Sequence, residues 1–180
     1  MGKVRIDILC AAALTLFLSI SAAAGEPLTV SWSELRASRP QSCAAFLAKY
    51  LGHQNCSQQI AITRLLSKRF EMCAPGEASL DGQLVRIAGF VHPLEFEFRN
   101  VRKFLLIPPL RQDCRHPPPP LPDQVIFVEY AEGIDVTADP VWVAGTLRVQ
   151  YEKNEIAPSG YTLQATSVTA ATIPEVLDGN

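Results

Sequence analysis

One short stretch of the sequence places a thiol close to an imidazole. Cys114 and His116 stand two positions apart within Leu106–Val128, and the prolines Pro117–Pro120 follow directly. Thiolate sulfur and imidazole nitrogen are ligands for zinc and copper. A nearby histidine can also lower the pKa of a cysteine and make it a nucleophile. The stretch therefore predicts either a metal site or thiol chemistry, and a purely structural loop is the alternative.

A metal site of this kind needs ligands from other parts of the chain. His92 is the best third ligand, and Asp113 or Glu95 could add an oxygen. Residues i and i+2 of an extended chain point to opposite sides, so the loop must turn before Cys114 and His116 can face one ion. The expected site is zinc or copper held by Cys114, His116 and His92.

The proline run sets the conformation of the loop that carries these groups. Each proline fixes φ and lacks an N–H, so the run can be neither a helix nor a central strand. We expect an extended, polyproline-like connection between two strands. The residues that we expect to contact a ligand or a protein partner are Pro117, Pro118, Pro119, Pro120 and Gln124.

Composition and motifs exclude several function classes. The chain has 16 Lys and Arg against 18 Asp and Glu, and no block of basic residues. A mildly acidic protein is a poor non-specific binder of nucleic acid. The sequence has no G-x-G-x-x-G, no P-loop, no G-x-S-x-G elbow and no C-x-x-C. These absences argue against a nucleotide cofactor, a serine hydrolase of the elbow type and a thioredoxin-type oxidoreductase.

Residues 1–24 have the pattern of a cleaved signal peptide. Lys3 and Arg5 precede the apolar run Ile8–Ile20, and the small residues Ala22–Ala24 form a cleavage site. We expect export to the periplasm or secretion, with no stable membrane anchor after cleavage.

Cleavage would leave four cysteines, Cys43, Cys56, Cys73 and Cys114. An exported compartment can oxidise them to disulfides. Cys43 and Cys56 flank a predicted helix, and helix ends joined by a short loop can approach disulfide distance. We therefore predict at least one disulfide within residues 41–73, with Cys43–Cys56 as the favoured pair. If the proline loop is only structural, Cys114 is buried or bonded to Cys73.

Residues 25–79 are predicted to form an N-terminal arm and a short helical segment stapled by this disulfide. A first helix is predicted to start at Ser31 or Ser33. Ser42 and Ser57 are candidate N-caps for two further helices with apolar residues at helical spacing.

Residues 80–172 are predicted to form a β-domain, and residues 173–180 a C-terminal tail. The chain lacks a long helical pattern here, and glycines lie inside the first and fourth predicted strands. These features favour a small five-stranded OB-like barrel over a sandwich. The segment Glu95–Arg99 also alternates like a strand. The main strand segments are Leu84–Val91, Phe104–Ile107, Val125–Tyr130, Val141–Tyr151 and Tyr161–Val168.

Trp142 and Tyr161 lie in two of these strands. We expect both to belong to the core. The alternative is an aromatic platform for a ligand on the barrel face.

Five short stretches of the sequence resemble the landmarks of an exported bacterial family, the domain of unknown function family 3299. The resemblance covers roughly residues 80–170 and implies an OB-like barrel. It also implies work alongside ABC-type transporters in metal acquisition. Leu121 interrupts the proline run, and Asp123 stands where the family usually has asparagine. The stretches are Gly89–Glu95, Phe104–Pro108, Cys114–Pro120, Asp123–Gln124 and Pro140–Thr146.

These features together predict a mainly β, exported binding or accessory protein that is not an enzyme. Its function would be linked to zinc or copper acquisition beside an ABC-type transporter, with the Cys-x-His-proline loop as the ligand or partner site. A small thiol- or metal-dependent enzyme and a purely structural interaction module are the alternatives.

Overall fold

The computed structural model describes residues 25–51, 55–94, 96–109, 115 and 120–178. Five strands close into a barrel in the order β2-β3-β4-β6-β5, because β2 also pairs with β5. Only β4 and β6 are parallel within this barrel. A sixth strand, β1 (Leu28–Thr29), pairs in parallel with β2 outside it. The barrel strands are β2 (Leu84–Pro93), β3 (Val101–Ile107), β4 (Ile126–Ile134), β5 (Val141–Arg148) and β6 (Tyr161–Ala170).

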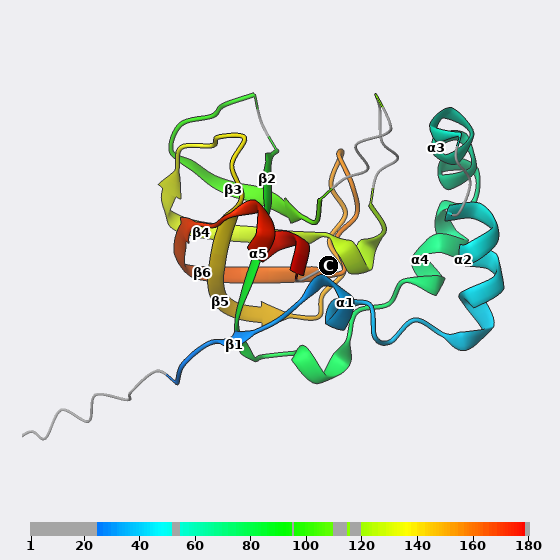
Figure 1. The fold of residues 1–180 in the computed structure, drawn as a ribbon, viewed down its shortest axis with the longest axis horizontal. Helices are drawn as coiled ribbons and strands as arrows, with labels where there is room; N and C mark the ends of the chain where they lie inside the picture. The colour runs from blue at the N-terminus through cyan, green and yellow to red at the C-terminus, as the bar shows by residue number, and fades with distance from the viewer. Residues whose placement is uncertain (1–24, 52–54, 95, 110–114, 116–119, 179–180) are drawn as a thin grey trace, which may run out of the picture.

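The predicted five-stranded OB-like barrel is therefore confirmed, and Figure 1 shows how its strands curve around a common centre. Gly89 explains how the sheet turns its corner. Residues 84–89 of β2 pair with β5, whereas residues 90–93 pair with β3. A Cβ atom at Gly89 would lie 2.9 Å from the Ile107 carbonyl oxygen and equally close to Trp32. A side chain would not fit where the strand changes partners.

The barrel core is filled by alternate residues of the strands, by Val30, Trp32 and Leu35 from the arm, and by Leu80. Trp32 and Leu35 are buried in this core on the one-turn helix α1 (Trp32–Leu35). Of the two predicted helix starts, Ser31 is the one that caps α1, and Ser31 and Glu34 form a complete capping box. Within this core, the strand residues that are less than 2% exposed are Val85, Ile87, Phe104, Leu106, Ile126, Val128, Val143, Leu147, Tyr161 and Leu163.

The predicted helical segment precedes the barrel and stands to one side of it in Figure 1. The 3-10 turn η1 (Gln41–Cys43) leads into α2 (Ala44–Leu51), which is followed by α3 (Cys56–Leu65) and α4 (Ser67–Cys73). The segment has its own small core. Leu121, the residue that interrupts the proline run, is buried in this core together with Phe46, Leu47, Phe70, Cys73 and Ala74.

The disulfide that staples this segment joins Cys43 to Cys73, so the predicted Cys43–Cys56 pair is wrong. The two bonded residues have their Cα atoms 5.6 Å apart. The C-terminal end of α4 lies next to η1, the turn before α2. The spacing of the cysteines in the sequence does not predict this proximity. The alternative pair of Cys73 with Cys114 is excluded by the same bond. Cys56 is also disulfide-bonded.

Some local predictions also differ from the structure. Asn55 rather than Ser57 caps α3, and α4 begins after a break at Leu66. Residues 96–100 form a loop instead of a strand, with Phe96 and Phe98 exposed. The expected C-terminal tail contains a short helix, α5 (Ile173–Asp178). Two further 3-10 turns are η2 (Ala78–Leu80) and η3 (Pro122–Gln124). Within the described residues, no helix has the length and apolarity to cross a bilayer.

Candidate functional site

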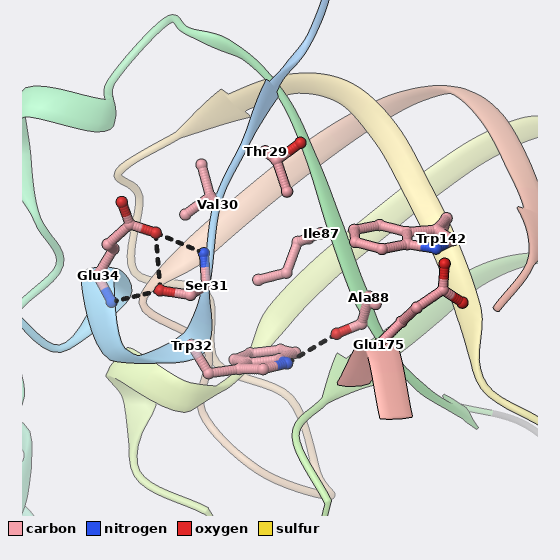
Figure 2. A pocket seen from close by; sticks show the side chains of 9 residues that line it. All are labelled: Thr29, Val30, Ser31, Trp32, Glu34, Ile87, Ala88, Trp142 and Glu175. Atoms are coloured by element: carbon pink, nitrogen blue, oxygen red, sulfur yellow. Dashed lines mark hydrogen bonds between the residues drawn. The ribbon is translucent and has the colours of Figure 1, made fainter. Parts of the chain in front are cut away.

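A cleft of about 350 Å³ lies between the N-terminal arm and the barrel, and we call it the arm cleft. Its floor is apolar, its walls include two tryptophans and its rim is polar (Figure 2). The arm contributes Thr29, Val30, Ser31, Trp32 and Glu34, β2 contributes Ile87 and Ala88, β5 contributes Trp142, and α5 contributes Glu175.

The arm is held against the barrel by main-chain and side-chain hydrogen bonds. Val30 N donates to the Arg86 carbonyl oxygen at 2.9 Å, which continues the β1–β2 pairing. Trp32 Nε1 donates to the Ala88 carbonyl oxygen at 2.7 Å, and Trp32 is only 1% exposed. A buried indole N–H with a partner carries no desolvation penalty. The arm side of the cleft is therefore preformed.

Trp142 forms the opposite wall. It points outward from β5 and is half-buried, so the expectation that it belongs to the core is wrong. The Arg86 guanidinium carbon lies 4.9 Å from its ring centroid, in cation–π range. Arg86 Nε in turn donates to Thr29 Oγ1 at 2.7 Å. These contacts orient the Trp142 ring. Tyr161, by contrast, is a fully buried core residue as predicted.

Two carboxylates stand at opposite ends of the cleft in Figure 2. Glu34 Oε2 accepts hydrogen bonds from Ser31 N and Ser31 Oγ, each at 2.7 Å. Glu175 Oε2 accepts from Thr172 N at 2.6 Å and from Thr172 Oγ1 at 2.8 Å. Both carboxylates are thus fixed at the starts of short helices, each by one of its two oxygens.

The charge of Glu175 is favoured by its surroundings. The backbone N–H and then the hydroxyl of Thr172, followed by the Trp142 side chain, lower the pKa of Glu175. A hydrogen bond to the charged form of an acid favours ionisation. Glu175 is therefore anionic at neutral pH.

Chemically, the cleft offers an apolar surface between an indole wall and anionic groups. Ligand sites generally combine an apolar lining with a few convergent polar groups. Carboxylates attract cations, and an indole face does so as well. The arm cleft is therefore suited to a small molecule with an apolar body and a positive charge.

A buried polar network fixes the base of the proline loop. Asp123, on η3, is fully buried and accepts from Arg39 Nη2 at 2.8 Å and from Arg39 Nε at 2.5 Å. The Tyr161 hydroxyl donates to the Leu35 carbonyl oxygen at 2.7 Å and accepts from Glu77 N at 2.6 Å. Burial is the main reason that the pKa of Tyr161 rises to about 12. These bonds tie the arm, η2, η3 and β6 together.

The structure describes only part of the site expected from the sequence. Cys114, His116 and Pro117–Pro119 lie outside the described residues. His92 is exposed on β2, opposite Leu105 of β3. In the described ranges, no group of three or more His, Cys, Asp or Glu side chains could hold a metal ion. Zinc or copper at Cys114, His116 and His92 therefore stays a prediction.

Two other residues of the expected partner loop are described. Pro120 and Gln124 are half-buried, Pro120 beside Leu121 and Gln124 at the end of η3. Pro120 also lines an apolar hollow of about 140 Å³ shared with α3 and α4. The base of the loop is therefore packed against the helical segment.

Sequence reasoning missed the arm cleft, although part of its signal was readable. Ser31-x-x-Glu34 and Thr172-x-x-Glu175 both follow the capping-box pattern, which predicts two fixed carboxylates. The pattern does not show that the two helices start on the same side of the barrel. Only the tertiary fold brings Glu34 and Glu175 to one cleft.

Comparisons with known proteins find one matching family and a similar crystal structure. The sequence profile of a family described as "Protein of unknown function (DUF3299)" matches residues 32–170. A crystal structure of a DUF3299 family protein from Pseudomonas aeruginosa is similar, with 30% sequence identity and a TM-score of 0.56. The similarity covers 82% of this chain and 97% of that one. No curated protein matches.

Proposed function

Because the chain belongs to the DUF3299 family, whose description is a protein of unknown function, we propose a function from the arm cleft. The protein is an exported binding protein, not an enzyme, and the arm cleft takes a small organic cation. The observation that carries this proposal is the pairing of the Trp142 wall with two fixed carboxylates, Glu34 and Glu175, over an apolar floor.

The size and the charges of the arm cleft define the ligand class. A cavity of about 350 Å³ is at the small end of ligand sites, so the ligand is compact. Its apolar body would cover Ile87 and Ala88, and its charge would lie toward Glu34 or Glu175. Arg86 contacts Trp142 and Thr29, and its positive charge also helps to lower the pKa of Glu175. One guanidinium cannot balance two carboxylates, so the pair Glu34 and Glu175 keeps an excess negative charge.

Export is supported by the disulfides. Cys43 is bonded to Cys73, and Cys56 is also in a disulfide. Structural disulfides persist in oxidising compartments such as the periplasm and are rare in the cytosol. The predicted signal peptide lies outside the described residues. It would send the protein to a compartment in which disulfides form.

A metal-linked role is the alternative form of this function, and it requires a free thiol at Cys114. It would place zinc or copper at Cys114, His116 and His92 and would make the protein an accessory of an ABC-type transporter. Its support is the sequence resemblance together with an exposed His92 on β2. Whether the Cys114 thiol is free or disulfide-bonded decides the metal-linked role. This can be measured without reference to ligand binding in the arm cleft.

Tryptophan fluorescence gives a direct test of the arm cleft. The sequence contains two tryptophans, Trp32 and Trp142, and both line the cleft. We expect phenethylamine to change their emission in a saturable way. Its neutral counterpart, phenethyl alcohol, should bind at least about tenfold more weakly because it lacks the charge.

Two substitutions separate specific binding from a general effect. Glu175→Gln should weaken phenethylamine binding by roughly three- to tenfold, because the charge is lost while shape is kept. Glu155→Gln, at an exposed position outside the cleft, is the matched control and should bind like the parent. Equal affinity for the amine and the alcohol, or no saturable binding below about 10 mM, would refute the proposal.

A further inference from the structure

A second concavity crosses the outer surface of the barrel, over β3, β4, β6 and the end of β5. We call it the barrel groove, and its volume is about 500 Å³. A neighbouring hollow of about 550 Å³ lies beside the loop between β2 and β3, and Lys103 lines both. The barrel groove is lined by Lys103 of β3, Phe127 and Glu129 of β4, Thr162 and Gln164 of β6, and Gln150 after β5.

The charges of the barrel groove are balanced. Lys103 Nζ lies 2.8 Å from Glu129 Oε1. The hydrogen bond to Glu129, and then its negative charge and that of Glu152, raise the pKa of Lys103. Arg148 lies 3.8 Å from Asp81, measured from Nη1 to Oδ2. The charged residues that line the groove are Lys103, Arg148, Glu129 and Glu152. Their formal charges cancel, so the groove has no net positive charge to attract a phosphate chain.

The uncharged polar groups of the barrel groove are open to a ligand. Within the described part of the chain, the structure gives the side chains of Gln150, Thr162 and Gln164 no hydrogen-bond partner. A glutamine amide presents donors and an acceptor side by side. Such groups can bind adjacent hydroxyls on a ligand.

An aromatic ring completes the lining. Phe127 is half-buried at the floor and is packed against the outward-facing cluster of Leu105, Val125 and Ala157. Leu105 and Val125 are fully buried, so they hold the Phe127 ring in place. The exposed part of the ring offers a flat apolar surface beside the polar groups.

We propose that the barrel groove binds a neutral oligosaccharide. A hexose ring combines neighbouring hydroxyls with an apolar C–H face, which matches amides and a hydroxyl next to a phenyl ring. The groove runs between the β2–β3 loop and the β5–β6 loop, which is the region that OB barrels use for oligosaccharides and oligonucleotides. The balanced charges favour the oligosaccharide. This site is separate from the arm cleft and does not depend on the proposed function.

Calorimetric titration of the mature chain tests the proposal with three neutral probes: maltohexaose, cellohexaose and chitohexaose. We expect saturable binding of at least one. Gln164→Ala should weaken it by about three- to tenfold, as for one lost hydrogen bond. Thr162→Val should act in the same direction. Gln58→Ala, an exposed glutamine on α3, is the matched control and should bind like the parent.

Three results would overturn the proposal. The first is absence of binding for all three hexasaccharides up to about 10 mM. The second is equal affinity of the Gln164→Ala, Thr162→Val and Gln58→Ala variants, once their melting temperatures show that they are folded. The third is tighter binding of an oligothymidylate hexamer than of any sugar, which would make the groove a nucleic-acid site.

Discussion

At the scale of single residues, Tyr161 links the barrel to the arm and to η2. Its ring is fully buried, and its hydroxyl has two backbone partners, the Leu35 carbonyl oxygen and Glu77 N. Burial disfavours the phenolate, so the neutral form is strongly preferred in the folded protein. In the unfolded chain the solvated side chain ionises at a lower pH, with a pKa of about 10. Folding and ionisation of Tyr161 are therefore coupled.

This coupling predicts a loss of stability at high pH. The pKa of Tyr161 is about 12 in the folded protein against about 10 in an unfolded chain. Its contribution is therefore complete below about pH 10 and is lost as the pH rises toward about 12. The free energy of unfolding should fall across this window, and Tyr161→Phe should make the fall shallower. Urea unfolding at several pH values measures both. Parallel curves for the parent and the variant would contradict the coupling.

At the scale of elements, sequence patterns predicted strands and capped helices better than connections. The apolar run that starts at Val125 leads into β4. Both faces of the chain are buried at this point, because Ile126 packs in the barrel core and Val125 packs in the cluster outside it. Glu95–Arg99 alternates equally well, yet residues 96–100 belong to no strand, and Phe98 O accepts a single backbone hydrogen bond from Val136 N. Asn100 adopts a φ of 51°, which belongs to a turn. Alternation alone cannot supply a neighbouring strand.

The same reasoning explains the errors at the candidate site. Trp142 has the hydrophobicity of a core residue, but its strand position points it outward, where it forms one wall of the arm cleft. The Cys43–Cys73 pair depends on how α2 and α4 meet around Phe46 and Phe70, whose ring centroids are 4.8 Å apart. Neither relation has a local signature in the sequence.

The helical segment should depend on its disulfide more than the barrel does. The bond closes a sequence separation of 30 residues, and the double substitution Cys43→Ala/Cys73→Ala should cost roughly 3 kcal/mol of that segment's stability. Hydrogen exchange should show faster exchange in α2–α4 and little change in β2–β6. Met72→Ala, an exposed residue of α4, is the control. Equal loss of protection in the barrel would show that the two cores unfold together.

At the scale of the whole molecule, one barrel supports two surfaces of different chemistry. The arm adds an acidic cleft beside β2 and β5, and the neutral groove crosses β3, β4 and β6. The helical segment and the proline loop meet at Leu121. A disulfide between the helical segment and the proline loop would join the two covalently. The number of cysteines in the chain predicts such a bond.

Cys56 is disulfide-bonded, while Cys43 and Cys73 are bonded to one another. The two other cysteines of the sequence are Cys10 and Cys114. If the predicted signal peptide is removed, Cys10 is lost with it, and Cys114 is the remaining partner for Cys56. A disulfide at Cys114 would consume the thiolate that the zinc or copper site requires.

We therefore predict two disulfides and no free thiol in the exported protein. Non-reducing peptide mapping should recover a Cys56–Cys114 peptide beside the Cys43–Cys73 one. Zinc should then leave the melting temperature of the parent and of His92→Ala unchanged, because two imidazoles without a thiolate make a weak site. A free Cys114 together with a zinc-dependent rise in melting temperature, lost in His92→Ala, would contradict this prediction and support the metal-linked function.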